Sequence, residues 1–397
     1  MKRKALCRII CVLLLTFWVE VKAQSPSYSD SVEVSLLTCG AGEEVWAQYG
    51  HTAIRWNDRK TGEDIVVNYG IFSQNQPYFL LRFIFGLTDY KVDTQSMTTF
   101  LRQYAYEGRS VVEQTLNLTP SEKQQIYTAL IENLKPKNVV YRYNFFYDNC
   151  TTRAHHLLLK GLKGRLQSQW RGDSNMTYRR MIHQWNAETP WVRLGEDLLL
   201  GIEADQLVTT TQQLFLPDNL RKYYGGATIN GRPLVSETHT LLYAATPPIT
   251  NISASLTPLT AAIVFAILAS VVFVMELWRK KKCRVWNIFL TLTSGIIGLV
   301  LFAMMFSEHP CVDVNAILLF FNPLTLVLLF GSLCKRVGKK MCIAWFVWEV
   351  MIFIGLITAI FQSIPLPILI VASFLLLNCG MQIYFAKCGN AHLRKLT

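Results

Sequence analysis

Hydrophobic and polar residues alternate along two neighbouring segments in the first quarter of the chain. Residues 51–56 place successive side chains on opposite faces, and residues 64–69 do so again after a polar turn over 58–62. Such period-two alternation on both sides of a turn predicts a β-hairpin. On the returning strand Asn68 falls on the less apolar face. Pairing of apolar face with apolar face then predicts that Asn68 lies beside His51.

Strands and helices are both expected around this hairpin, which indicates an α+β domain. The pattern predicts further strands over 32–38, 90–94, 111–116 and 139–144, and helices over 77–86, 97–106, 120–134 and 151–160. Thr119, Pro120 and Glu122 form a capping signal for the helix that begins at 120. Asn149 is a good N-cap for the helix that follows it.

The last third of the chain is almost continuously apolar, unlike the rest. Five spans are expected, each near the length of about 20 residues that crosses a bilayer: 257–278, 285–306, 316–333, 341–361 and 366–386. Residues 1–23 have the basic start, short apolar run and small terminal residues of a cleaved signal peptide.

These patterns divide the chain into a signal peptide (1–23), an extracytoplasmic domain (24–256) and a five-helix membrane domain (257–397). The accessory region, residues 164–250, is less regular than the rest of the extracytoplasmic domain. Its tryptophans fit two interpretations: simple packing around the domain, or a cover that faces an acyl chain or the membrane.

The net charge of +12 is concentrated beside the apolar spans. Basic residues cluster after the first, third and fifth spans, whereas the loops after the second and fourth carry no such excess. The positive-inside tendency then predicts that the soluble domain lies outside and the C-terminus in the cytoplasm. Because the charge is explained by topology, we expect no nucleic-acid partner.

A single cysteine at the start of a helix is the strongest chemical signal. Cys150 would feel the positive end of the helix dipole, which favours the thiolate. His51 can serve as general base to this nucleophile, and Asn68 is placed to orient the imidazole. The alternatives are a Cys39–Cys150 disulfide, since exported proteins meet an oxidising space, and a buried structural His51.

Other histidines and polar residues have weaker signals. His155 and His156 follow Cys150 and are interpreted as surface residues. His309 and Asn315, between the second and third spans, fit either helix capping or a functional site near the membrane. The sequence has neither a CxxC pair nor an HExxH motif, so we expect no metal and no cofactor.

Four stretches resemble those of the Lnb lipoprotein N-acyltransferase family, as do His309 and Asn315. They are YGHTAIR at 49–55, NYGIF at 68–72, QTLNLT at 114–119 and DNCTTR at 148–153. The order of histidine, polar strand residue and helix-start cysteine also resembles the permuted papain-like fold of lecithin:retinol acyltransferase and NlpC-type enzymes.

The resemblance implies a thiol-dependent, ping-pong acyltransferase in the bacterial inner membrane, with its soluble domain in the periplasm. Cys150 would take an acyl chain from a glycerophospholipid as a thioester and pass it to the N-terminal amine of a diacylated lipoprotein. Backbone N–H groups at the start of the Cys150 helix would hold the oxyanion. The expected substrate-binding residues are Tyr49, Tyr69, Asn149, Arg153, His309 and Asn315. A membrane-anchored cysteine hydrolase, either a phospholipase or a cell-wall amidase, is the alternative function. A non-catalytic envelope-binding module with Cys150 bridged to Cys39 is a third.

Overall fold

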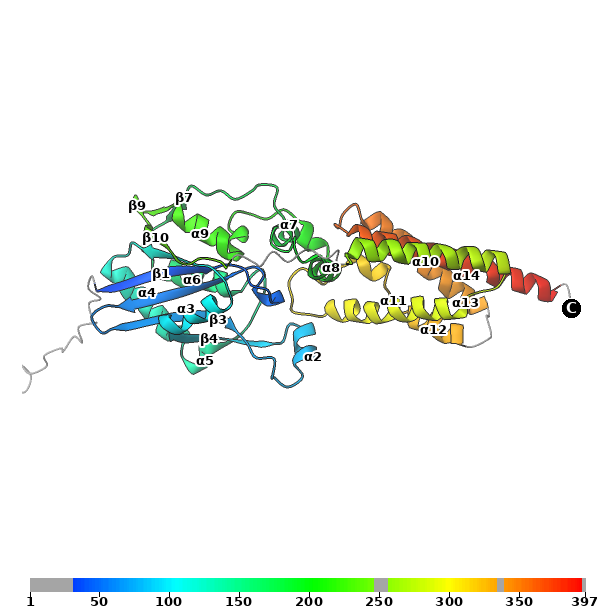
Figure 1. The fold of residues 1–397 in the computed structure, drawn as a ribbon, viewed down its shortest axis with the longest axis horizontal. Coiled ribbons are helices and arrows are strands. Elements are labelled where there is room, and N and C mark those ends of the chain that lie inside the picture. Colours follow the sequence, from blue (N-terminus) through cyan, green and yellow to red (C-terminus); the bar gives the residue numbers. More distant parts are fainter. Residues whose placement is uncertain (1–30, 246–255, 334–338, 395–397) are drawn as a thin grey trace, which may run out of the picture.

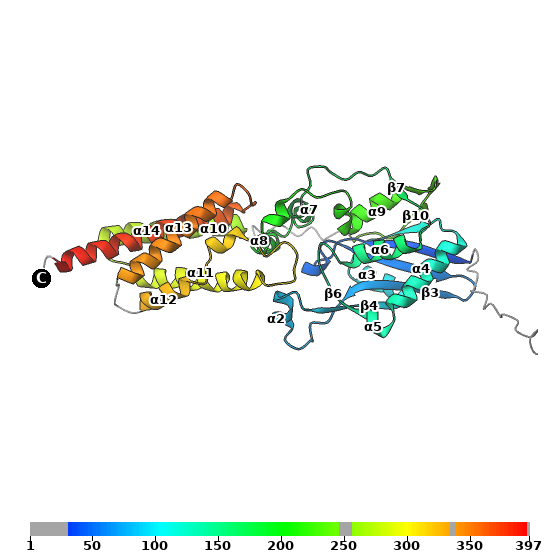
Figure 2. The same cartoon turned by 180° about the vertical axis from the view of Figure 1, so that it is seen from behind.

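The computed structural model describes residues 31–245, 256–333 and 339–394, and the predicted signal peptide lies outside these ranges. A soluble head with a large sheet is joined end-on to a bundle of long helices (Figure 1). The C-terminal end of the last helix lies at the far end of the bundle from the head (Figure 2).

The head is built on a seven-stranded sheet with the order β10-β5-β1-β2-β3-β4-β6, in which every neighbouring pair is antiparallel. The strands are β1 Val32–Cys39, β2 His51–Asp58, β3 Glu63–Ile71, β4 Asp89–Ser96, β5 Val111–Leu116, β6 Val140–Arg142 and β10 Val235–Leu242. β2 and β3 form the predicted hairpin, with Ala53 opposite Asn68. The strand expected over 139–144 is shorter, because the helical turn α5 Pro136–Val139 precedes it.

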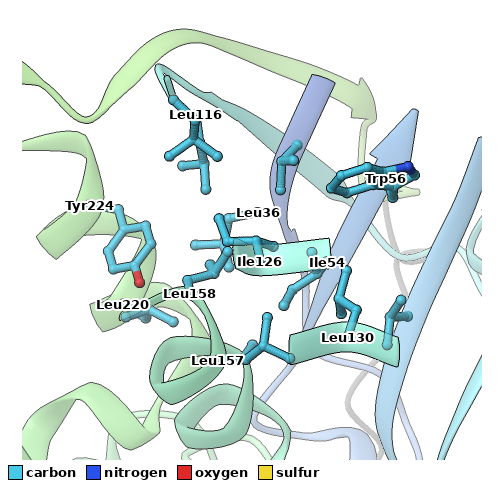
Figure 3. Close-up of a cluster of buried hydrophobic side chains, with 14 of the residues drawn as sticks. Leu36, Ile54, Trp56, Leu116, Ile126, Leu130, Leu157, Leu158, Leu220 and Tyr224 are labelled. Carbon is cyan, nitrogen blue, oxygen red and sulfur yellow. The ribbon is translucent and has the colours of Figure 1, made fainter. Parts of the chain in front are cut away.

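Helices cover both faces of this sheet. On one face lie α4 Pro120–Asn133, α6 Cys150–Gly161 and α9 Pro217–Gly225, and on the other lies α3 Met97–Tyr106. Figure 3 shows the larger core, where Leu36, Ile54 and Trp56 of the sheet meet Ile126 of α4 and Leu158 of α6. Thr119 and Glu122 complete a capping box at the start of α4, as predicted.

The accessory region belongs to both parts of the molecule. It supplies β10, the edge strand beside β5, and a small sheet of β7 Leu166–Ser168, β8 Ala227–Ile229 and β9 Arg232–Pro233. It also forms α7 Tyr178–His183, α8 Pro190–Leu199 and the short 3-10 turns η2 Ile202–Asp205 and η3 Gln212–Phe215. Helices α7 and α8 lie where the head meets the bundle (Figure 1). The remaining short elements of the head are η1 Val45–Ala47 and α2 Phe79–Ile84.

Within the described ranges, four helices are long and apolar enough to cross a membrane: α10 Pro258–Arg279, α11 Arg284–Met304, α13 Lys339–Thr358 and α14 Leu366–Arg394. The third predicted span differs from expectation. It consists of the 3-10 turn η4 Ala316–Leu319 and α12 Thr325–Leu333, while residues 334–338 lie outside the described ranges. Pro323 lacks a backbone N–H, and the Asn322 side chain caps the broken chain by accepting from Leu324 N at 3.0 Å.

Candidate active site

Cys150 is the first residue of α6 and is held there by its neighbour. The Asn149 side chain accepts hydrogen bonds of 2.9 Å from both Thr151 N and Thr152 N, which caps the helix. It also donates to the carbonyls of Phe145 and Phe215. All of these bonds are internal, so the structure uses Asn149 to fix the turn that presents the thiol.

The start of β2 brings His51 to this helix end. Gly50 has φ +77°, and a Cβ there would lie 2.5 Å from Cys39 O, so only glycine fits the turn into the strand. Thr52 Oγ1 lies 3.0 Å from Thr151 Oγ1, which ties β2 to α6. The Cys150 thiol and the His51 ring consequently lie close enough for each to shift the pKa of the other.

Asn68, on the neighbouring strand β3, forms a row with His51 and Cys150. Its Oδ1 lies 3.1 Å from His51 Nε2, which leaves Nδ1 as the ring nitrogen that can serve the thiol. Asn68 is 5 % exposed and Cys150 is 8 % exposed, so both ends of the row are buried. A neutral or protonated imidazole donates Nε2–H to this amide oxygen, which keeps the ring in one orientation.

Electrostatics favour the thiolate of Cys150. Burial raises the pKa of the thiol, but the charge and hydrogen bond of His51 lower it, together with hydrogen bonds from Thr52 N and Thr151, to about 7. Burial alone would lower the pKa of His51, yet the Cys150 thiolate and the hydrogen bond to Asn68 outweigh it and raise that pKa. An acidic thiol beside a basic imidazole is the state that nucleophilic catalysis requires.

Tyr143 is a further member of this site that the sequence reasoning did not single out. The Tyr143 hydroxyl lies near the backbone N–H of Cys150. Gly70, at φ +86°, allows the close approach: a Cβ there would lie 3.2 Å from Tyr143 Cε2 and 3.9 Å from Cys150 Cβ. Burial holds the pKa of Tyr143 well above its usual range, so its hydroxyl stays protonated and can donate. The aromatic run around Tyr141–Tyr147 was the available signal.

The competing disulfide is not formed, because Cys39 and Cys150 are both free thiols. Cys39 instead contacts the Tyr104 side chain on the other face of the sheet. Among the described residues, no group of three or more His, Cys, Asp or Glu side chains is arranged to hold a metal ion.

Two family models match the chain. That of the Lnb N-terminal periplasmic domain covers residues 22–184, and that of the Lnb transmembrane domain covers residues 250–388. The chain belongs to the Lnb family. No curated protein and no solved structure matches it. As a member of the Lnb family it is a membrane protein of lipoprotein maturation and an enzyme, with a periplasmic head.

Three of the expected substrate-binding residues of this Lnb protein lie in the head, engaged with other parts of the protein. Tyr49 donates its hydroxyl to Glu196 of α8. Tyr69 is 1 % exposed in the core beneath α6. Arg153 pairs with Asp148 at 2.6 Å and covers the Tyr141 ring. These contacts brace the loops around the site.

His309 and Asn315 lie at the joint between head and bundle. His309 Nε2 bonds Phe83 O. Asn315 donates to Leu198 O and Leu199 O, and its Oδ1 accepts from Ile317 N and Gln362. Both the nitrogen and the oxygen of the Asn315 side-chain amide are therefore hydrogen-bonded to other groups of the protein.

A buried ion-pair network strengthens the same joint. Arg179, 1 % exposed, pairs with Asp197 and Asp205 and donates to the carbonyls of Leu200 and Gly201. Gly201 N in turn donates to Cys311 O in the loop after α11. The head is therefore anchored to the bundle at several points, which holds the Cys150 turn close to it. Tyr147, three residues before Cys150, lies with its hydroxyl 3.4 Å from Cys311 Sγ.

His155 corrects one interpretation of the sequence. It is buried, with Nδ1 3.0 Å from the Tyr224 hydroxyl, whereas His156 is exposed as expected. Burial and the neighbouring His156 lower the pKa of His155 to about 4. It is a neutral core residue on the side of α6 that packs against α9.

Proposed function

We propose that this Lnb protein is a lipoprotein N-acyltransferase of the inner membrane, with its C-terminus in the cytoplasm. The observation that carries the proposal is the row of Cys150, His51 and Asn68, in which Asn68 holds the imidazole that lowers the pKa of the thiol. The row lies beside the loop that follows a membrane-spanning helix. Nucleophile, base and orienting group in this order are the parts that acyl transfer through a thioester needs. The permuted papain-like arrangement is part of the same proposal.

In the first half-reaction the Cys150 thiolate attacks an acyl ester carbonyl of a glycerophospholipid. The carbon–oxygen bond to glycerol breaks, and the departing alkoxide takes a proton from the His51 imidazolium. A thioester and a lysophospholipid result. In the second half-reaction the α-amine of a diacylglyceryl-cysteine lipoprotein attacks the thioester and loses a proton to the neutral His51 imidazole. The carbon–sulfur bond then breaks, which restores the Cys150 thiolate beside the His51 imidazolium.

The oxyanion of each tetrahedral intermediate needs two donors. Asn149 already occupies the N–H groups of Thr151 and Thr152, which disfavours them. We assign the role to the Cys150 N–H and the Tyr143 hydroxyl, which meet beside the thiol. Fixed donors at the developing charge are a large source of catalysis.

The test uses the full-length protein in vesicles that contain a phospholipid with a labelled acyl chain and a diacylated lipopeptide. We expect labelled, triacylated lipopeptide from the wild type. Without the lipopeptide, we expect the label on Cys150, from which neutral hydroxylamine releases it. Cys39→Ala should behave like the wild type, and Cys150→Ala should give neither product.

Two outcomes would overturn the proposal. Transfer by Cys150→Ala would remove the thioester from the mechanism. Release of the label only as free fatty acid, with lipopeptide present, would identify a membrane-anchored cysteine hydrolase instead.

A further inference from the structure

A continuous row of rings connects the surroundings of Cys150 to the loop that follows α11. Neighbouring ring centroids are 4.5, 5.1, 6.2, 5.9 and 5.5 Å apart along the series. This aromatic row consists of Tyr143, Tyr90, Phe72, Phe79, Phe83 and His309. One end of the row thus lies at the proposed oxyanion donor and the other at the joint with the membrane domain.

The row is open along one side. Tyr143, Tyr90, Phe72 and Phe79 are half-buried, and Phe83 is 44 % exposed. Helix α2 adds Leu80, 69 % exposed, and Leu81, 56 % exposed, and Tyr78 before it is 80 % exposed. Exposed apolar area costs about 25 cal/mol per Å² in water. So many large apolar side chains on one six-residue helix mark a surface that something apolar covers.

Backbone contacts place the end of α2 against the membrane domain. The carbonyls of Phe83, Ile84 and Phe85 accept hydrogen bonds from His309, Ser307 and Glu308. These three donors follow α11 directly, and both views show α2 beside that end of α11 (Figures 1 and 2).

Phe302 in the last turn of α11 is 46 % exposed, and Phe306, two residues after the end of α11, is 66 % exposed. A spanning helix presents such side chains to lipid. The exposed face of α2 therefore continues the lipid-facing surface of the bundle.

We propose that α2 is seated in the head-side leaflet of the bilayer and that the aromatic row guides one acyl chain of a glycerophospholipid from that leaflet to Cys150. Flat, rigid rings cover a flexible chain at little entropic cost, and the tyrosine hydroxyls at the inner end suit the ester group. The destination of the chain rests on the proposed function, whereas the seating of α2 in lipid does not.

The seating is tested in the full-length Cys150→Ala protein, so that no thioester can carry the label. Benzoylphenylalanine replaces Leu81, or Ile131 as the matched control. Ile131 is 44 % exposed on α4, which lies in the part of the head away from the bundle. After illumination in vesicles of phosphatidylethanolamine and phosphatidylglycerol with labelled acyl chains, we expect labelled protein from the Leu81 position only. Equal labelling at both positions would overturn the seating.

The route is tested by comparing donors of two chain lengths. Phe79→Ala should lower kcat/KM about tenfold for a dipalmitoyl phospholipid. It should leave dihexanoyl phospholipid, which reaches the thiol from water, nearly unchanged. Phe83→Ala, at a more exposed position, should show the same selectivity to a smaller degree, and Ile131→Ala none.

Loss of activity by the same factor for both donors, in both variants, would overturn the route. Failure of the wild type to acylate lipopeptide from either donor would instead count against the proposed function. The crosslink to Leu81 would be unaffected by that result.

Discussion

Two buried thiols of the head, Cys39 and Cys150, have pKa values shifted in opposite directions. Cys39 is 1 % exposed and Cys150 is 8 % exposed, so burial acts on both. Burial raises the pKa of Cys39 to about 12, with only partial relief from the hydrogen bond to Tyr104 and the charge of Arg109. The pKa of Cys150 falls to about 7, because His51 outweighs burial.

The difference shows that the partners of a cysteine, and not its depth, decide its chemistry here. Cys39 sits within strand β1, where the backbone amides belong to the sheet and apolar side chains surround the sulfur. Cys150 begins a helix, where the positive end of the helix dipole favours an anion. Of the two thiols, only Cys150 has its pKa lowered by an imidazole, that of His51.

The largest expected effect comes from making the surroundings of Cys150 resemble those of Cys39. His51→Ala should lower kcat/KM for acyl transfer by about 10³-fold, because base and thiolate are both lost. In the wild type, alkylation of Cys150 by iodoacetamide should accelerate as pH rises through about 7. In the variant that rise should move to higher pH, since the lowering of the thiol pKa by His51 is then lost.

Peptide mass spectrometry after timed alkylation measures both thiols in one sample. His156→Ala, an exposed position on the same helix, is the control. An alkylation midpoint that stays near its wild-type value in His51→Ala would contradict this explanation of the difference between the two cysteines.

Removing the Tyr143 hydroxyl should have the next largest effect. Tyr143→Phe keeps the ring stacked on Tyr90 but loses the second oxyanion donor, so kcat should fall by about 10²-fold. The alkylation profile of Cys150 should stay near that of the wild type. Tyr223→Phe on α9 is the control. Full activity in Tyr143→Phe would exclude its hydroxyl from the reaction.

Asn68→Ala should reduce kcat less, about 10-fold, because the imidazole stays near the thiol but loses its orientation. Asn68→Asp retains an acceptor oxygen and should recover most of the rate, with a shifted pH profile. Steady-state kinetics between pH 6 and pH 9 measure both, a range of about one to two units around the thiol pKa. Equal rates for the alanine and aspartate variants would argue against an orienting role.

The smallest effect on activity should come from Cys39. Cys39→Ala should leave transfer within about twofold of the wild type, while removal of a buried sulfur lowers the free energy of unfolding by about 1 kcal/mol. Thermal unfolding in detergent measures the second effect. A loss of activity comparable to that of Cys150→Ala would show that the two thiols cooperate.

Local sequence patterns predicted much of the fold. Alternation in 51–56 and 64–69 predicted the hairpin that holds His51 and Asn68, and the observed pairing of Ala53 with Asn68 has the expected faces. The capping residues predicted helices at 120 and 150 nearly to the residue. These signals act within a few residues, which is why one sequence reveals them.

Contacts between distant segments decided what the sequence left open or misjudged. The edge strand β10 pairs with β5, which lies more than one hundred residues earlier in the chain. Most residues of β10 are exposed, so its sequence shows no clear alternation of apolar and polar residues that would predict a strand. His155 is buried only because Tyr224 of α9 packs against it. The third apolar span has a suitable composition but breaks at Asn322 and Pro323.

The sequence by itself therefore determined the hairpin, the reactive helix start, the apolar spans and the residue types of the site. The tertiary structure alone decided that Tyr143 meets the thiol, that α2 lies beside the end of α11, and that Cys39 stays a free, unreactive thiol. The physical reason is the distance along the chain over which each interaction acts. Caps and periodicity act over one or two turns of chain, whereas a pKa or a docking contact depends on residues that only the complete fold brings together.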